Sequence, residues 1–182
     1  MNSIIQTILN LVTSLFDAPE VKQQKKPKFN AKGQPKRVAD IDHIKKWEQL
    51  RLKAYLPTPH DRWTIGWGHT GTAEKGMVIT EKQAEKLLRS DLKWVEKVIH
   101  EFVDVSLTQK QFDALAGLVF NIGQGNFVNS TVLRRLNASD MRGAADAMMM
   151  WTKQRQNGKL VELRGLVRRR KEEKELFLNG TA

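Results

Sequence analysis

The sequence contains no cysteine, which excludes disulfide frameworks and thiolate metal sites. Folding therefore does not require an oxidising compartment. The histidines show no spacing typical of metal ligands; they are His43, His60, His69 and His100. We therefore expect neither a metal nor an organic cofactor.

Long hydrophobic runs are also missing. No run reaches the roughly eighteen apolar residues of a transmembrane helix. The N-terminus lacks the positive region and the small-residue cleavage site of a secretory signal. These absences predict synthesis and folding in the cytoplasm.

Acidic residues are few: the 182 residues include 20 Asp and Glu against 31 Lys and Arg, a net charge of +11. Such a chain favours an anionic partner, which can be nucleic acid, anionic lipid or the acidic polymers of a bacterial envelope. Charge alone does not choose among these. The length suits one domain plus a tail, and a hydrophobic content of 40% excludes global disorder.

The first 38 residues fall into two segments. Residues 1–17 carry apolar side chains at helical spacing opposite an uncharged polar face, which predicts an amphipathic helix. We favour packing on its own domain or self-association over a membrane-surface anchor, since such anchors carry Lys or Arg on the polar face; an uncleaved export signal is the third interpretation. Residues 18–38 are rich in lysine and contain Pro27, Gly33 and Pro35, which predicts a flexible basic linker. Residues 39–182 then form the main domain.

Helical patterns dominate that domain. Asp40 or Asp42 can cap a helix near Ile41, and apolar spacing extends this pattern to Arg51. Residues 62–67 alternate as a strand. Capping signals at Thr80 and Thr108 open two longer helices, and further helical stretches lie near 130–137, 140–152 and 162–177, with a turn at Asn157-Gly158 that can close a small hairpin.

Glu48 is the first candidate for chemistry. It lies at the end of a helical pattern, beside Trp47, and a short glycine-rich hairpin follows with Thr64, Gly66 and His69. An apolar setting raises the pKa of a carboxylic acid and lets it donate a proton near neutral pH. A hydroxyl such as that of Thr64 can hold a water, and glycines allow close approach of a ligand.

The stretch from Trp47 to Thr70 closely resembles the active-site entrance of the phage-type lysozymes, glycoside hydrolase family 24. In that family the entrance reads Glu, eight residues, Asp or Cys, five residues, Thr. Glu48 and Thr64 match, whereas Pro57 occupies the middle position and fifteen residues, one more than in the family, separate Glu48 from Thr64. Pro57 cannot act as a base, and Asp61 is the only carboxylate in the longer turn, so Asp61 is our candidate for activating water. In the alternative interpretations, Asp61 only caps the turn, and the water is held by His60 or by Thr64 alone.

The resemblance extends over roughly residues 40–178. It implies that Asn121 faces the cleft. His69 matches a histidine of the family, for which we expect a structural, hydrogen-bonded role, with direct catalysis as the alternative. The run Arg168-Arg169-Arg170-Lys171 also looks like the family, and we expect it to be a solvated helix face. As candidate site residues we take Glu48, Asp61 and Thr64 for catalysis and Gly66, His69 and Asn121 for substrate binding.

The resemblance implies an α+β fold: a mostly helical, two-lobed lysozyme domain with one small antiparallel hairpin sheet in the N-terminal lobe. It implies hydrolysis of the β-1,4 bond between N-acetylmuramic acid and N-acetylglucosamine in peptidoglycan, with inversion, where two carboxyls lie about 6.5–9.5 Å apart. The expected partners are glycan strands, with anionic envelope contact through residues 1–37, no nucleic acid and a monomeric state. The protein would act on the cell wall after release from the cytoplasm. A lytic transglycosylase, favoured by Pro57, and a non-enzymatic cationic envelope-binding protein are the alternatives.

Overall fold

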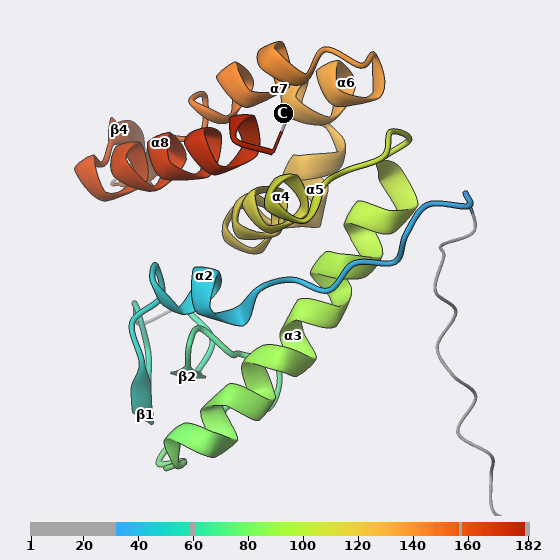
Figure 1. Cartoon of the computed structure of the whole chain (residues 1–182). Coiled ribbons are helices and arrows are strands. Elements are labelled where there is room, and N and C mark those ends of the chain that lie inside the picture. Colours follow the sequence, from blue (N-terminus) through green and yellow to red (C-terminus); the bar gives the residue numbers. More distant parts are fainter. Residues whose placement is uncertain (1–31, 59–60, 157, 181–182) are drawn as a thin grey trace, which may run out of the picture.

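The long helix α3 (Glu81–Phe102) connects a small N-terminal lobe to a helical C-terminal lobe (Figure 1). This architecture is that of a computed structural model, which describes residues 32–58, 61–156 and 158–180. The N-terminal lobe contains α2 (Ile41–Lys45), β1 (Arg51–Tyr55) and β2 (Thr64–Gly66). The C-terminal lobe contains α4 (Gln109–Ile122), α5 (Gln124–Val128), α6 (Thr131–Asn137), α7 (Met141–Met148), β3 (Lys153–Gln156), β4 (Lys159–Glu162) and α8 (Arg164–Leu178). The predicted mostly helical, two-lobed α+β fold is confirmed.

Capping boxes start both α3 and α4, as the sequence predicts. The Thr80 hydroxyl accepts the backbone N–H of Gln83, and the Gln83 side chain accepts the N–H of Thr80. Thr108 and Gln111 make the same reciprocal pair at α4. Each box satisfies backbone donors that a helix N-terminus would otherwise leave unpaired.

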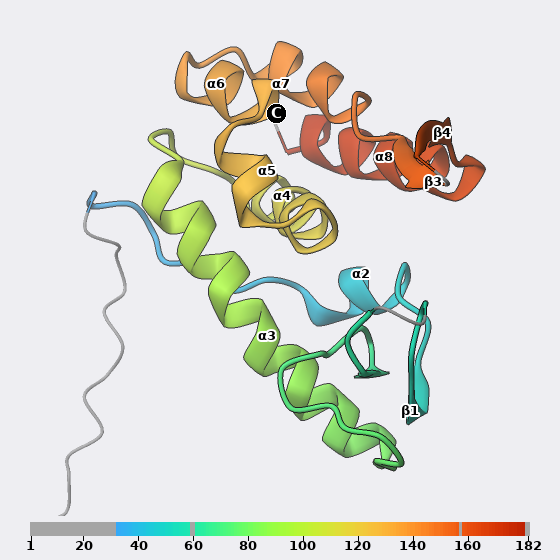
Figure 2. The same cartoon turned by 180° about the vertical axis from the view of Figure 1, so that it is seen from behind.

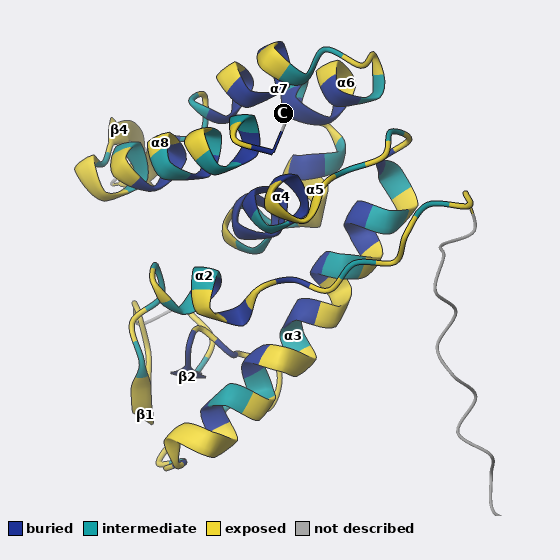
Figure 3. Cartoon of the chain, viewed as in Figure 1, coloured by how far each residue is buried: buried dark blue, intermediate teal, exposed yellow. Residues whose placement is uncertain are grey.

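The core of the C-terminal lobe surrounds α4. This helix packs against α8, α3, α2 and α5 and is buried along most of its length (Figure 3). Its buried apolar residues are Phe112, Ala114, Leu115, Ala116, Leu118 and Val119. Because α4 is covered on several sides, its C-terminal end can project into the space between the lobes with little freedom to move.

The predicted helical pattern up to Arg51 is wrong beyond Lys45. Residues 51–55 form strand β1 instead, which pairs with β2 on one edge. On its other edge, Ala54 N–H donates to Met77 O, and Ile79 N–H donates to Leu52 O, both at 2.9 Å. These pairings with distant segments override the local apolar spacing.

A second hairpin lies in the C-terminal lobe. The turn signal at Asn157-Gly158 allowed for it, although the predicted fold included only one sheet, in the N-terminal lobe. Strands β3 and β4 pair antiparallel with Gln154 opposite Val161, and both are exposed along their length. The helix expected over 140–152 ends earlier, at Met148. Gly158, with φ of +81°, adopts the left-handed conformation that a tight turn requires.

The last part of the predicted linker lies along α3 and the start of α4 (Figures 1 and 2). Arg37 Nε donates to Leu107 O at 2.7 Å, and Gln109 Nε2 donates to Val38 O at 2.9 Å. Ala39 N–H donates to the Glu96 carboxylate at 3.1 Å. The predicted helix 1–17 and the linker up to residue 31 lie outside the described residues. In the described ranges, no helix combines the length and the apolar character needed to cross a membrane.

These contacts predict that residues 32–38 stabilise the domain. Deleting residues 1–38 should lower the urea unfolding midpoint more than deleting residues 1–31, because each lost hydrogen bond costs about 0.5–1.5 kcal/mol. Arg37→Ala in the full chain removes one of these contacts and should lower the unfolding midpoint by part of the same amount. Equal midpoints for the two deletions would contradict this prediction and support a domain that begins at residue 39.

The packing of α2 on α4 buries part of His43. Its Nε2 atom is buried and has no hydrogen-bond partner in the described part of the chain. Burial lowers the pKa of His43 below its ordinary value of 6.5, and the neighbouring Arg169 acts in the same direction, while Asp113 opposes both. The folded protein therefore favours the neutral imidazole.

This lowered pKa predicts that stability falls as the pH drops below 6.5, because the unfolded chain then binds a proton that folded His43 resists. His43→Gln should flatten the dependence of the free energy of unfolding on pH between about pH 5.5 and 7.5. Asp113, whose pKa burial raises, contributes at lower pH and with the opposite sign. An unchanged slope in the variant would show that other groups carry the effect.

Candidate active site

A cleft of about 400 Å³ lies between the two lobes. Its lining comes from four segments: the loop after α2, the loop after β2, α3, and the end of α4. The lining residues are Glu48, Gly68, Thr70, Gly71, Asp91, Trp94, Phe120 and Asn121. Trp94 and Phe120 stack with their ring centroids 6.5 Å apart. The cleft therefore combines an apolar wall with two carboxylates and an amide.

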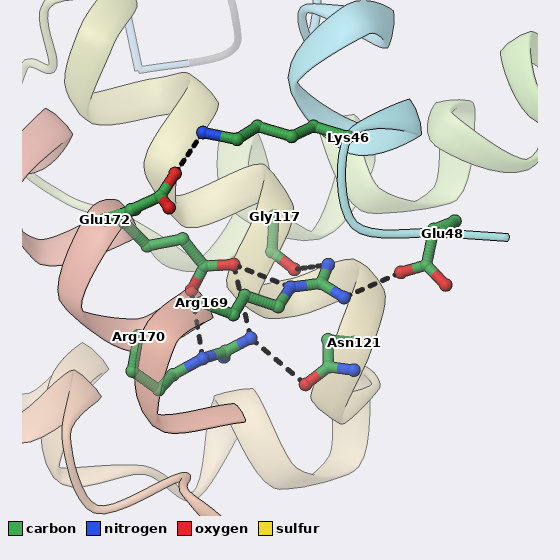
Figure 4. Close-up of polar contacts among 8 residues, drawn as sticks. Lys46, Glu48, Gly117, Asn121, Arg169, Arg170 and Glu172 are labelled. Carbon is green, nitrogen blue, oxygen red and sulfur yellow. Dashed lines mark hydrogen bonds and ion pairs between the residues drawn. The ribbon is translucent and has the colours of Figure 1, made fainter. Parts of the chain in front are cut away.

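Glu48 lies in the loop between α2 and β1, with 22% of its side chain exposed. Its Oε1 accepts a hydrogen bond at 2.7 Å from Nη1 of Arg169, on α8 (Figure 4). The sequence predicted an apolar setting, but the direct partner is this guanidinium. An ion pair of this geometry holds the carboxylate in one place at the cleft wall.

The prediction of a solvated arginine face is wrong for two of its four residues. Arg168 and Lys171 are exposed, whereas 4% of Arg169 and none of Arg170 is exposed. Arg169 Nη2 donates to Gly117 O at 3.1 Å, and Arg170 Nη2 donates to Asn121 Oδ1 at 3.1 Å. The site residues predicted from the sequence do not include these arginines.

Glu173, one helical turn further along α8, is fully buried between the two guanidinium groups. Its Oε1 accepts from Arg169 Nε at 3.0 Å and from Arg170 Nη2 at 3.2 Å. Burial raises the pKa of Glu173, and both arginines oppose that rise. Burial also lowers the pKa of Arg170 to about 10, so Arg170 remains a cation at neutral pH.

His69 is buried beside the cleft, and both of its ring nitrogens form hydrogen bonds. Thr72 N–H donates to Nε2 at 3.0 Å, which identifies Nε2 as the unprotonated nitrogen of a neutral ring. Nδ1 then donates to the Asp91 carboxylate at 2.9 Å. His69 thus holds Asp91, which lines the cleft, and does not line it directly.

Asp61 and Thr64 are not among the residues that line the cleft. Asp61 is exposed in the turn and accepts a hydrogen bond from Thr58 Oγ1 at 2.8 Å. Thr64 is buried, and its hydroxyl donates to Arg62 O at 3.0 Å. The structure therefore does not bring these two predicted residues together with Glu48 in one group of cleft residues.

Gly66 is also absent from the lining, and its role here is packing. Its φ is +64°, and an added Cβ would lie 3.3 Å from the Cβ of Ala84 on α3. The glycine that lines the cleft is Gly68, two residues further on. Asn121 lies where the sequence predicted it, at the cleft. Among the described residues, no group of three or more His, Asp or Glu side chains could hold a metal ion.

Comparison with known proteins agrees with this architecture. The model of the phage lysozyme family matches residues 45–173. An endolysin of Acyrthosiphon pisum secondary endosymbiont phage 1 is 48% identical over 134 residues, which cover 74% of this chain and 91% of that protein. The endolysin of Salmonella phage P22 is 44% identical over 144 residues, covering 76% and 94%.

A solved structure shares both the fold and much of the sequence. The muramidase domain of SpmX from Asticaccaulis excentricus matches with a TM-score of 0.72 and 44% identity, over 75% of this chain and 92% of that one. The match to the family model includes the loop that carries Glu48, the cleft lining and the buried arginines of α8. On these grounds the chain belongs to the phage lysozyme family.

Proposed function

We propose that Glu48 is the general acid with which this lysozyme hydrolyses peptidoglycan. The chain is a glycoside hydrolase of the endolysin type, in keeping with its family and relatives. The observation that carries the proposal is the place of Glu48: its carboxyl group lines the cleft and is held there by Arg169 at 2.7 Å. Asp91, the other carboxylate of the lining, is already bound to His69.

The substrate in this proposal is a glycan strand that lies along the cleft. The stacked rings of Trp94 and Phe120 offer an apolar surface to a sugar face, and Asn121 offers an amide for hydrogen bonds to its polar substituents. Glu48 then protonates the oxygen of the β-1,4 bond between N-acetylmuramic acid and N-acetylglucosamine. A water attacks the anomeric carbon from the opposite face and gives a proton to a base, for which Asp61 is the candidate carboxylate. The bond to the departing sugar breaks with inversion.

Asp61 and Thr64 remain our candidates for holding that water. Both belong to the N-terminal lobe and to the turn and strand that follow Glu48. Each has a local partner now, Thr58 for Asp61 and Arg62 O for Thr64. Asp61 has a second carboxylate oxygen, and the Thr64 hydroxyl can still accept a hydrogen bond, so each can bind a water without losing this partner.

Gly66 and His69 support the cleft in this proposal: Gly66 packs the hairpin on α3, and His69 orients Asp91. We further propose that the protein is a monomer made in the cytoplasm of the bacterial host, and that it reaches the cell wall after release. The net charge of +11 supports attraction to an anionic envelope, to which residues 1–37 contribute many lysines.

Replacing Glu48 tests the assignment of the acid. Glu48→Gln keeps the shape of the side chain but cannot donate the proton, so turnover should fall by about 10²–10⁴. The measurement is clearing of a peptidoglycan suspension, with thermal unfolding as the check on folding. Glu74→Gln, an exposed glutamate of the same lobe, is the matched control. Near-normal clearing by Glu48→Gln would refute the assignment.

The products separate hydrolysis from transglycosylation. Mass spectrometry of digested, purified peptidoglycan should detect free reducing ends, because water is the nucleophile in the proposed reaction. Anhydro ends would instead show attack by a hydroxyl of the substrate. Such ends would contradict the hydrolytic mechanism while leaving the role of Glu48 intact.

Two substitutions distinguish the candidates for holding the water. If Asp61 activates water, Asp61→Asn should lower turnover by about two orders of magnitude or more with little change in melting temperature. If Asp61 only closes the turn with Thr58, the variant should keep most of its turnover and lose about 1 kcal/mol of stability. Wild-type turnover in Asp61→Asn together with a large loss in Thr64→Val would assign the water to Thr64 alone.

A further inference from the structure

One buried carboxylate on α8, that of Glu173, links both guanidinium groups that reach the cleft. Arg169 and Arg170 extend from adjacent positions of the same helix (Figure 4). Both form ion pairs with Glu173. From there Arg169 reaches Glu48 of the N-terminal lobe, and Arg170 reaches Asn121 at the end of α4. The two ends of this network are therefore two residues of the cleft lining.

Burial of this kind is costly. A carboxylate and a guanidinium with no exposed surface lose their hydration, and the ion pair between them often does no more than offset this loss. An apolar pair of similar size could fill the same space between α4 and α8 at no such cost. The arrangement is therefore weak evidence of a role in stability alone, and a role in the cleft accounts for the charges.

The carboxylate of Glu173 lies close to the backbone of α4 at Gly117. An added Cβ on Gly117 of α4 would lie 2.9 Å from Glu173 Oε1 and 3.2 Å from His43 Nε2. The absence of a side chain at this position lets the carboxylate approach α4 closely. It also lets Arg169 donate to the carbonyl of Gly117 itself, at 3.1 Å.

We propose that Glu173 is a positioning residue for the reaction: it orients Arg169 and Arg170 so that these hold Glu48 and Asn121 in place on the two sides of the cleft. The inference rests on the proposed role of Glu48 as the general acid. Glu173 itself does not line the cleft and acts only through the two arginines.

The charges of the network give the proposal a measurable signature. Two cations, Arg169 and Arg170, face the carboxylate of Glu173 and the carboxyl group of Glu48, with His43, Asp113 and the surface pair of Lys46 and Glu172 nearby. Without the charge of Glu173, two cations remain beside Glu48 and favour its ionised form. The acid then loses its proton at lower pH, so the alkaline limb of the activity profile should move to lower pH.

Glu173→Gln in the full chain tests this inference, with purified glycan strands as substrate. We expect kcat to fall about 10- to 100-fold because the acid is misplaced, with KM changed far less, and the alkaline limb to move to lower pH. Glu172→Gln is the matched control: it removes the neighbouring carboxylate and its ion pair with Lys46 but leaves Arg169 and Arg170 with their partners. A wild-type kcat and an unmoved limb in folded Glu173→Gln would overturn the proposal.

Glu173→Asp is the second variant. It keeps the charge and shortens the reach, so kcat should lie between those of Glu173→Gln and the wild type, with the alkaline limb at its wild-type position. If Glu173→Gln does not fold, a wild-type kcat in Glu173→Asp overturns the proposal. Failure of both variants to fold also counts against it, since a purely structural role then explains the residue.

Glu48→Gln in the same assay separates the two proposals. Turnover that survives in Glu48→Gln would refute the assignment of the acid, whatever Glu173→Gln does. An inactive Glu48→Gln beside a fully active Glu173→Gln would refute only the positioning role.

Discussion

The ion pair between Glu48 and Arg169 is the contact on which the geometry of the cleft depends. It joins residues 121 positions apart and connects the N-terminal lobe to the helix α8. A single hydrogen-bonded pair can hold such a position only if both groups are themselves held, and Arg169 has two further partners, Glu173 and Gly117 O. The position of Glu48 in the cleft is therefore set by contacts inside the C-terminal lobe.

Local signals in the sequence were sufficient to predict where two of the helices, α3 and α4, begin. The capping boxes at Thr80 and Thr108 identify the starts of α3 and α4 because the hydrogen bonds that begin a helix involve residues only three positions apart. The place of Asn121 at the cleft could likewise be predicted, here from the resemblance to the family. Strand β1 could not, since its partners at residues 64–66 and 77–79 are distant in the sequence.

The burial of Arg169 and Arg170 could not be predicted from the sequence, for a different reason. A run of four basic residues on a helix is usually solvated, because burial of a charge is costly unless it is paired. The signal that distinguishes Arg169 and Arg170 is Glu173, three and four positions further on, which pairs with both. That spacing also occurs on exposed helix faces, so it predicts burial only once α4 is known to cover this side of α8. The choice of Asp61 as the candidate second carboxylate also used no tertiary contact, since it depends only on the turn in which Asp61 lies.

Arg169 follows every residue of the cleft lining in the sequence, and this order has a consequence for biosynthesis. When residues 39–122 have left the ribosome, Glu48 and all the other residues that line the cleft are present, but helix α8, which carries Arg169, has not yet been made. A chain released before α8 lacks the partner of Glu48, and with it the constraint on the cleft. Translation therefore supplies the residues that line the cleft first and the partner of Glu48 later, when α8 is made.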